Sequence, residues 1–158
     1  MSLNLIIFGL VSFLHDLFTF IWMGGLIVTA LAFMPALKTA IGGTPQAKKV
    51  LAAFQKRQSS WVYISIAGLI LTGLAMAKRN PSFESLFGFG NPYMIILSIK
   101  HVLVVLMIGI SIYRSRLIGR EKGPVATQKE ALSAKLVITN ASLAVLVLLA
   151  SGFLAALA

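Results

Sequence analysis

Four long apolar runs constrain this chain more than any other feature of its sequence. They cover residues 3–34, 61–77, 94–113 and 136–158, and each is near or above the roughly 17 to 25 residues that cross the hydrocarbon core of a bilayer. With 58% hydrophobic and 11% charged residues, the composition lies outside the range of soluble proteins. We therefore predict that residues 1–158 form one domain, an all-α membrane protein built as a four transmembrane helix up-down bundle.

The formal charge of +10 is a topology signal and does not indicate nucleic acid. Lysine and arginine gather between the first and second runs and between the third and fourth. By the positive-inside rule, these two connections are cytoplasmic and both termini lie on the outer side of the membrane. We expect a multi-pass protein of the prokaryotic plasma (inner) membrane with the lipid bilayer as its partner. The chain has no cysteine, which excludes disulfides, thiolate metal sites and covalently attached haem.

Proline, glycine and capping residues predict where the helices begin and end. Pro35 is expected to kink or end the first helix. The second and third helices should each begin with a cap followed by proline at the first helical position, and the fourth with a capping box. The boundary signals are Gly42 with Gly43, Thr44 with Pro45, Asn80 with Pro81, Asn91 with Pro92, residues 119–124, and Thr127 with Glu130.

One face of the second helix is expected to pack closely against a neighbour. Arg57, Trp61, Ser65, Gly68 and Thr72 follow one another at steps of four and three, which places them on one stripe. Small and hydroxylated residues let membrane helices approach closely. A packing seam is the first interpretation, and space for a flat cofactor is the alternative.

The two histidines of the chain each lie inside an apolar run. His15 precedes Asp16 in the first helix, and His101 follows Lys100 in the third. These helices are parallel and diagonal in an up-down bundle, and both histidines lie about 13 to 18 Å below the outer helix ends. Asp16 and Lys100 rotate to the same side of the line that joins the histidines. Since ionisable groups at membrane depth are costly and usually functional, we predict that His15 and His101 share one ligand.

The ligand that this pair suits best is the iron of haem b, held by two axial imidazoles, with copper as the alternative. Separate hydrogen bonds between helices are the third interpretation. Trp22 would pack on the macrocycle, and Lys100 or Arg79 would bind its propionates. The alternative for Arg79 is that it extends to the membrane interface. No catalytic residue is identified. The residues expected around the ligand without binding it are Asp16, Arg57 and Asn140, the last through an interhelical hydrogen bond.

Several strings resemble the copper resistance protein D (CopD-like) domain and the related HemJ-type membrane proteins. They are LHDLFTFIWMGGL in the first helix, RQSSWVYISIAGLILTGL in the second, ILSIKHVLVVLM in the third and NASLAVLVLLASG in the fourth. The resemblance implies a four-helix core. It implies copper movement across the inner membrane on the CopD side. On the HemJ side it implies haem binding and protoporphyrinogen oxidation, with a histidine matching His15 and a lysine matching Lys100. This chain departs from both patterns by placing His101 directly after that lysine.

Two functions follow from these expectations. The first is a haem b-binding membrane protein, a small b-type cytochrome or haem-dependent oxidoreductase with a quinone or another redox partner. The alternative is a CopD-like protein of copper transport or homeostasis, although the six methionines are scattered and form no paired thioether motif. A structural subunit without cofactor is a third reading, and a homo-oligomer is compatible with all three.

Overall fold

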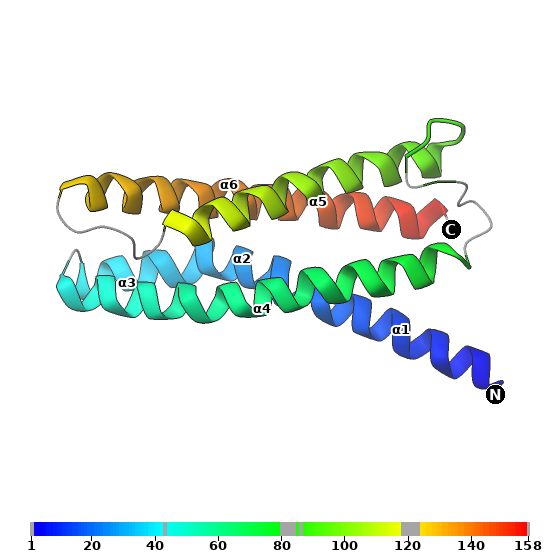
Figure 1. The fold of residues 1–158 in the computed structure, drawn as a ribbon, viewed down its shortest axis with the longest axis horizontal. Helices are drawn as coiled ribbons and strands as arrows, with labels where there is room; N and C mark the ends of the chain where they lie inside the picture. Colours follow the sequence, from blue (N-terminus) through cyan, green and yellow to red (C-terminus); the bar gives the residue numbers. More distant parts are fainter. Residues whose placement is uncertain (1, 43, 80–84, 86, 118–123, 158) are drawn as a thin grey trace.

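The predicted four-helix membrane fold is confirmed by the computed structural model, which describes residues 2–42, 44–79, 85, 87–117 and 124–157. In this part of the chain, four helices are long and apolar enough to cross a membrane: Leu3–Ile41, Pro45–Ala77, Pro92–Arg116 and Ala131–Leu157. Consecutive helices run in opposite directions, so the beginning of the first and the end of the last lie at the same end of the bundle (Figure 1).

The first membrane helix is continuous but not uniformly α-helical. It consists of α1 (Leu3–Thr19), the π-helical turn η1 (Phe20–Gly24), α2 (Gly25–Val28), a second π-helical turn η2 (Thr29–Phe33) and α3 (Met34–Ile41). Of the two outcomes expected at Pro35, a kink or an end of the helix, the end is wrong, because α3 continues through the proline. The wider turn η2 ends two residues before the proline, whose missing N–H and bulky ring would disturb a regular α-helical ladder. The helix ends at Gly42, whose φ of 29° suits glycine.

The other three membrane helices are α4 (Pro45–Ala77), α5 (Pro92–Leu117) and α6 (Pro124–Leu157). Two predicted caps are confirmed: Ala47 N donates to Thr44 Oγ1 over 3.2 Å, and Met94 N donates to Asn91 Oδ1 over 2.8 Å. The predicted start of the last helix at Thr127 is wrong by one turn, because a proline at the first helical position begins α6. The signals at Asn80, Pro81 and residues 119–123 lie outside the described residues.

The first and third membrane helices lie diagonally across the bundle, as expected. The first packs against α4 through α1 and α3 and against α6 through α2, while α5 packs against α6 and, less extensively, α4. The N-terminal part of α1 diverges from the other helices of the bundle (Figure 1). No residue of α1 is buried.

The predicted seam on α4 is partly correct. Ser65 and Thr72 are buried, and Gly68 lies so close to the Phe18 ring that an added Cβ would overlap it. Arg57 and Trp61 are exposed, because they lie one residue before the stripe that faces the bundle. The residues of that stripe recur at steps of three and four and are Gln55, Gln58, Val62, Ser65, Leu69 and Thr72.

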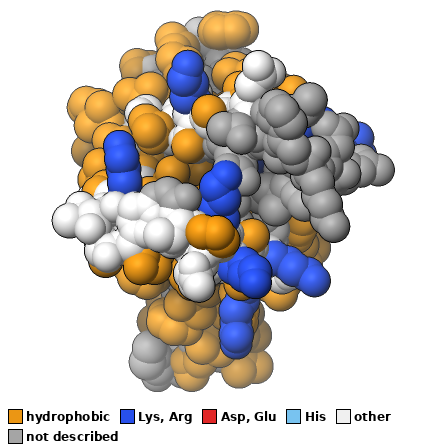
Figure 2. Space-filling view, turned by 90° about the vertical axis from the view of Figure 1, so that its left-hand side faces the viewer, with side chains coloured by type: hydrophobic (Ala, Val, Ile, Leu, Met, Phe, Trp, Pro, Cys, Tyr) orange, Lys and Arg blue, Asp and Glu red, His pale blue; other side chains and the backbone are white. Residues whose placement is uncertain are grey.

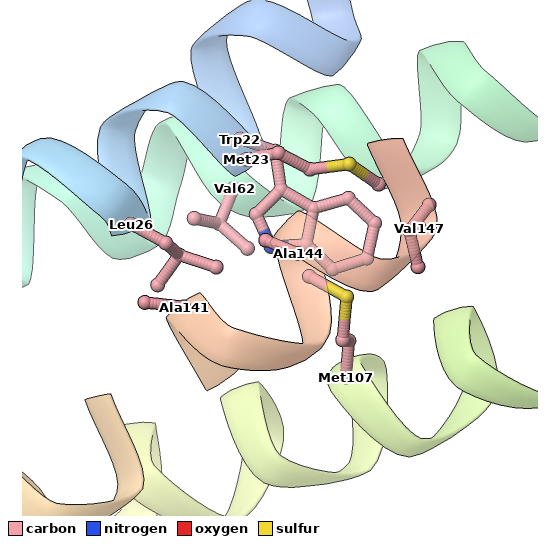
Figure 3. Packing of buried hydrophobic residues seen from close by; sticks show 8 residues of the cluster. All are labelled: Trp22, Met23, Leu26, Val62, Met107, Ala141, Ala144 and Val147. Carbon is pink, nitrogen blue, oxygen red and sulfur yellow. The ribbon is translucent and has the colours of Figure 1, made fainter. Parts of the chain in front are cut away.

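The hydrophobic core lies midway along the bundle, where all four membrane helices contribute. Trp22 is completely buried at its centre, and the sulfur-bearing side chains of Met23 and Met107 lie beside its ring (Figure 3). Small residues of α6 leave room for the indole. The cluster consists of Trp22, Met23, Leu26, Val62, Met107, Ala141, Ala144 and Val147.

Positive charge gathers at one end of the molecule, which we call the basic end; the opposite end, where α1 begins and α6 ends, is the far end. Figure 2 shows several lysine and arginine side chains on the basic end and, among the described side chains visible there, no carboxylate. Their positions agree with the two basic connections of the sequence. The described basic residues here are Lys38, Lys48, Lys49, Lys56, Arg57, Arg114, Arg116, Lys129 and Lys135.

Candidate functional site

His15 lies on the side of α1 that packs against α4. Its Nδ1 is 2.8 Å from Thr72 Oγ1, and its Cε1 would be 3.6 Å from a Cβ added at Gly73. The imidazole edge therefore lies at van der Waals distance from the place a side chain of residue 73 would start. His15 is half-buried, and its bond to Thr72 joins α1 to α4.

The hydrogen bonds of Thr72 determine which nitrogen of His15 carries the proton. Thr72 Oγ1 donates its single hydrogen to Gly68 O over 2.7 Å. It must therefore accept from His15, whose Nδ1 is the donor. In the neutral imidazole this leaves the lone pair on Nε2. A histidine whose Nδ1–H is held by the protein and whose Nε2 is free is prepared to bind a metal ion.

Lys100 approaches His15 from the opposite helix. It is half-buried and belongs to the stripe of α5 that faces the bundle. Its charge acts on both His15 and Asp16, and Asp16 is exposed on α1. We call His15, Asp16, Thr72 and Lys100 the His15 site. The stripe of α5 that carries the lysine runs at steps of four and three through Lys100, Val104, Met107, Ser111 and Arg114.

His101 has a different environment. Its Nδ1 donates to Leu97 O of its own helix over 2.8 Å, and its ring lies 5.9 Å from that of Phe87 at 57°. Because successive helical residues differ by about 100° in direction, His101 lies beside the inward stripe that Lys100 occupies, and it is likewise half-buried. The structure thus brings Lys100 into range of His15, and the sharing of one ligand by His15 and His101 stays a prediction.

The connection before α5 folds back onto the helix beside His101. Ser98 Oγ accepts from Gly88 N over 2.9 Å and donates to Gly88 O over 3.1 Å. Met94, one turn earlier, is almost fully buried against the same glycine. His101, Ser98 and Met94 therefore share a face of α5 that faces this connection.

The remaining predicted site residues lie apart from the His15 site. Arg79 donates to Asn4 O over 3.3 Å and its guanidinium lies 4.7 Å from the Phe8 ring centre, so it fastens the start of α1 to the end of α4. Arg57 is exposed at the basic end. Trp22 lies in the core, and its buried Nε1 has no hydrogen-bond partner among the described residues.

Asn140 makes the interhelical hydrogen bond that the sequence predicts. Its Nδ2 donates to Ser111 Oγ over 3.0 Å and to Met107 O over 3.4 Å, which ties α6 to α5. A second polar link escaped sequence reasoning: Gln58 Nε2 donates to Thr29 Oγ1 over 2.9 Å. Gln58 lies four residues before Val62 on the inward stripe of α4, and that spacing would have pointed to it.

The fold and the site define an integral membrane four-helix bundle with a hydrogen-bonded, half-buried histidine. The family described as copper resistance protein D (CopD) matches residues 48–156, which include α5 and nearly all of α4 and α6. The chain belongs to this family. The matched region starts after the first membrane helix, so His15 and Asp16 lie outside it. Searches of curated proteins and of solved structures gave no significant match.

Proposed function

We propose that the protein handles cuprous ion as cargo within the membrane and that His15 is its principal ligand. The observation that carries this proposal is the chain of hydrogen bonds from His15 through Thr72 to Gly68, which leaves Nε2 as the free nitrogen in a protein of the CopD family. Imidazole and thioether groups are ligands that copper accepts.

The core supplies two thioethers below the His15 site. Met23 and Met107 are 3% and 0% exposed, and both lie beside the Trp22 ring (Figure 3). Met23 follows His15 by eight residues, about 12 Å along the helix. The histidine and the thioethers would therefore act as successive contacts for a copper ion rather than as one closed site.

The charges around His15 suit a cargo that must leave again. Lys100 is within electrostatic range of His15 and opposes a bound cation, while Asp16 partly offsets the lysine. Transport requires binding that is strong enough for entry and weak enough for release. Together with the positive-inside pattern, we infer that the His15 site faces the outer half of a prokaryotic plasma membrane.

Copper uptake into vesicles containing the purified full-length protein tests the proposal. With cuprous ion and a reductant outside, His15→Ala should reduce the rate about tenfold or more, and the double variant Met23→Leu/Met107→Leu should also slow it. Met34→Leu, a half-buried methionine outside the core cluster, serves as the control. Uptake equal to that of protein-free vesicles, or uptake indifferent to His15→Ala, would contradict copper handling through this histidine.

Haem b is the second candidate, favoured by one observation: His15 and His101 both use Nδ1 for a hydrogen bond and keep Nε2 free. His101 hydrogen-bonds to its own helix and lies near Phe87, so a common axial site for the two histidines stays a prediction. The visible spectrum separates the candidates. A Soret band with sharp reduced α and β bands, lost in His101→Ala, would support haem and an oxidoreductase with a quinone or redox partner.

A further inference from the structure

A cavity opens between α4 and α5 at the basic end, remote from the His15 site. Its volume is about 600 Å³. One ammonium group and four hydroxyl groups line it, together with two alanines that leave it wide. The lining residues are Ala52, Ala53, Lys56, Ser59, Ser60 and Tyr63 of α4 and Ser115 of α5.

A buried guanidinium lies beside this cavity. Arg114 immediately precedes Ser115, is 3% exposed, and acts electrostatically on Tyr63 across the α4–α5 boundary. Its Nη1 is buried and has no hydrogen-bond partner among the described residues. A buried cation with an unused donor is costly unless an anion compensates it. The described side chains around the cavity supply hydroxyl groups but no carboxylate.

The cavity crosses the level at which α4 enters the apolar layer. Lys56 lies in the polar first part of the helix, and Tyr63 follows it by two turns, about 10 Å deeper. Both side chains are exposed, so a molecule in the surrounding bilayer can reach them. The cationic donor lies near the membrane surface and the Tyr63 hydroxyl lies deeper. This order of donors suits a phospholipid phosphate whose acyl chains are directed toward the membrane centre.

We propose that this cavity binds the phosphate of an anionic phospholipid from the leaflet at the basic end. Lys56 and Arg114 provide the charge, and the hydroxyls of Tyr63 and Ser115 provide neutral donors. Arginine and lysine are the side chains that phosphate groups usually recruit. The bound lipid bridges α4 and α5, which contact each other less extensively than α5 and α6 do.

Lipid binding by the full-length protein tests this proposal. The protein is placed in nanodiscs of neutral phosphatidylcholine, with or without phosphatidylglycerol, and retained lipid is counted by native mass spectrometry while thermal unfolding is followed in parallel. We expect phosphatidylglycerol to be retained and to raise the Tm. Lys56→Gln should weaken its retention about tenfold, as loss of one charge-assisted hydrogen bond implies, and Arg114→Gln should do the same.

Lys49→Gln provides the matched control, because Lys49 is an exposed lysine on the same helix that does not line the cavity. If Arg114→Gln fails to fold, Tyr63→Phe replaces it, since this change removes one hydroxyl and keeps the ring. Equal loss of lipid in Lys49→Gln and Lys56→Gln would overturn the proposal by showing nonspecific attraction. Equal stabilisation by inorganic phosphate in phosphatidylcholine nanodiscs would overturn the assignment to a lipid.

Discussion

Thr72 controls His15 although it cannot itself bind a soft metal strongly. Its hydroxyl has one hydrogen, and Gly68 O receives it; the histidine must therefore donate from Nδ1. The hydroxyl of a threonine in a membrane helix commonly donates to a carbonyl of the preceding turn. Here the same hydroxyl also fixes the orientation of the imidazole. The residue that sets the chemistry of this site is thus a neutral side chain on α4.

Thr72→Val should allow His15 to adopt both neutral tautomers. Valine has nearly the same shape but no oxygen, so Nδ1 loses its acceptor and the proton can move to Nε2. In protein labelled with ¹⁵N-histidine, we expect the His15 resonances to shift toward a tautomeric mixture while those of His101 stay unchanged. The protein should lose about 1 kcal/mol of stability.

Thr72→Ser is the matched control for that experiment because it keeps the hydroxyl. Its His15 resonances should resemble those of the unmodified chain. If Thr72→Val leaves the ¹⁵N spectrum of His15 unchanged, the threonine neither determines the tautomer nor keeps Nε2 free.

At the scale of helices, one glycine determines how closely α1 can approach α4. A Cβ at Gly68 would overlap the Phe18 ring, and Phe18 follows His15 by three residues. The close approach therefore lies one turn from the bond between His15 and Thr72. Small residues serve this purpose in membrane helices because packing, rather than hydrophobic burial, drives their association.

Gly68→Ala should separate α1 from α4 and destabilise the protein. We expect a loss of about 1 to 3 kcal/mol, the usual cost of an overpacked contact, seen as a lower Tm in detergent. Gly109→Ala is the control, because a Cβ there meets no atom within 4 Å and alanine favours a helix over glycine. Equal Tm values for the two variants would show that the α1–α4 contact is not tight at Gly68.

Helix boundaries could be predicted where the signal is local. Thr44 and Asn91 cap their helices as the sequence indicates, since each cap involves only its own first turn. The π-helical turns η1 and η2 could not be predicted, because a π turn takes one additional residue and no residue type marks its position. The predicted start of α6 is wrong because two start signals lie close together in the sequence. The helix begins at the proline at position 124 and not at the capping box.

For the whole molecule, the sequence predicts which residues are unusual better than it predicts which of them meet. Asp16, His15 and Lys100 are identifiable as ionisable groups at membrane depth. Whether Lys100 or His101 faces the bundle depends on helix phase, and a difference of one residue changes the direction by about 100°. The inward stripe of α5, which includes Met107 and places Lys100 inward, is defined only by its packing against α4 and α6.

Membrane orientation is the property of the whole molecule that remains to be measured, and the absence of cysteine makes the measurement simple. Single substitutions Ser2→Cys and Ser85→Cys place a thiol at the far end, and Gln46→Cys places one at the basic end; all three positions are exposed. Because lysine and arginine gather at the basic end, we expect it in the cytoplasm.

A membrane-impermeant maleimide should therefore label Ser2→Cys and Ser85→Cys in intact cells and Gln46→Cys only after permeabilisation. The unmodified chain, which has no thiol, gives the background. The opposite pattern would place His15 in the cytoplasmic half of the membrane and the α4–α5 cavity in the outer leaflet. It would also reverse the direction from which copper reaches the histidine. The lipid proposal would then be tested in the other leaflet, because the cavity and its charges belong to the bundle itself.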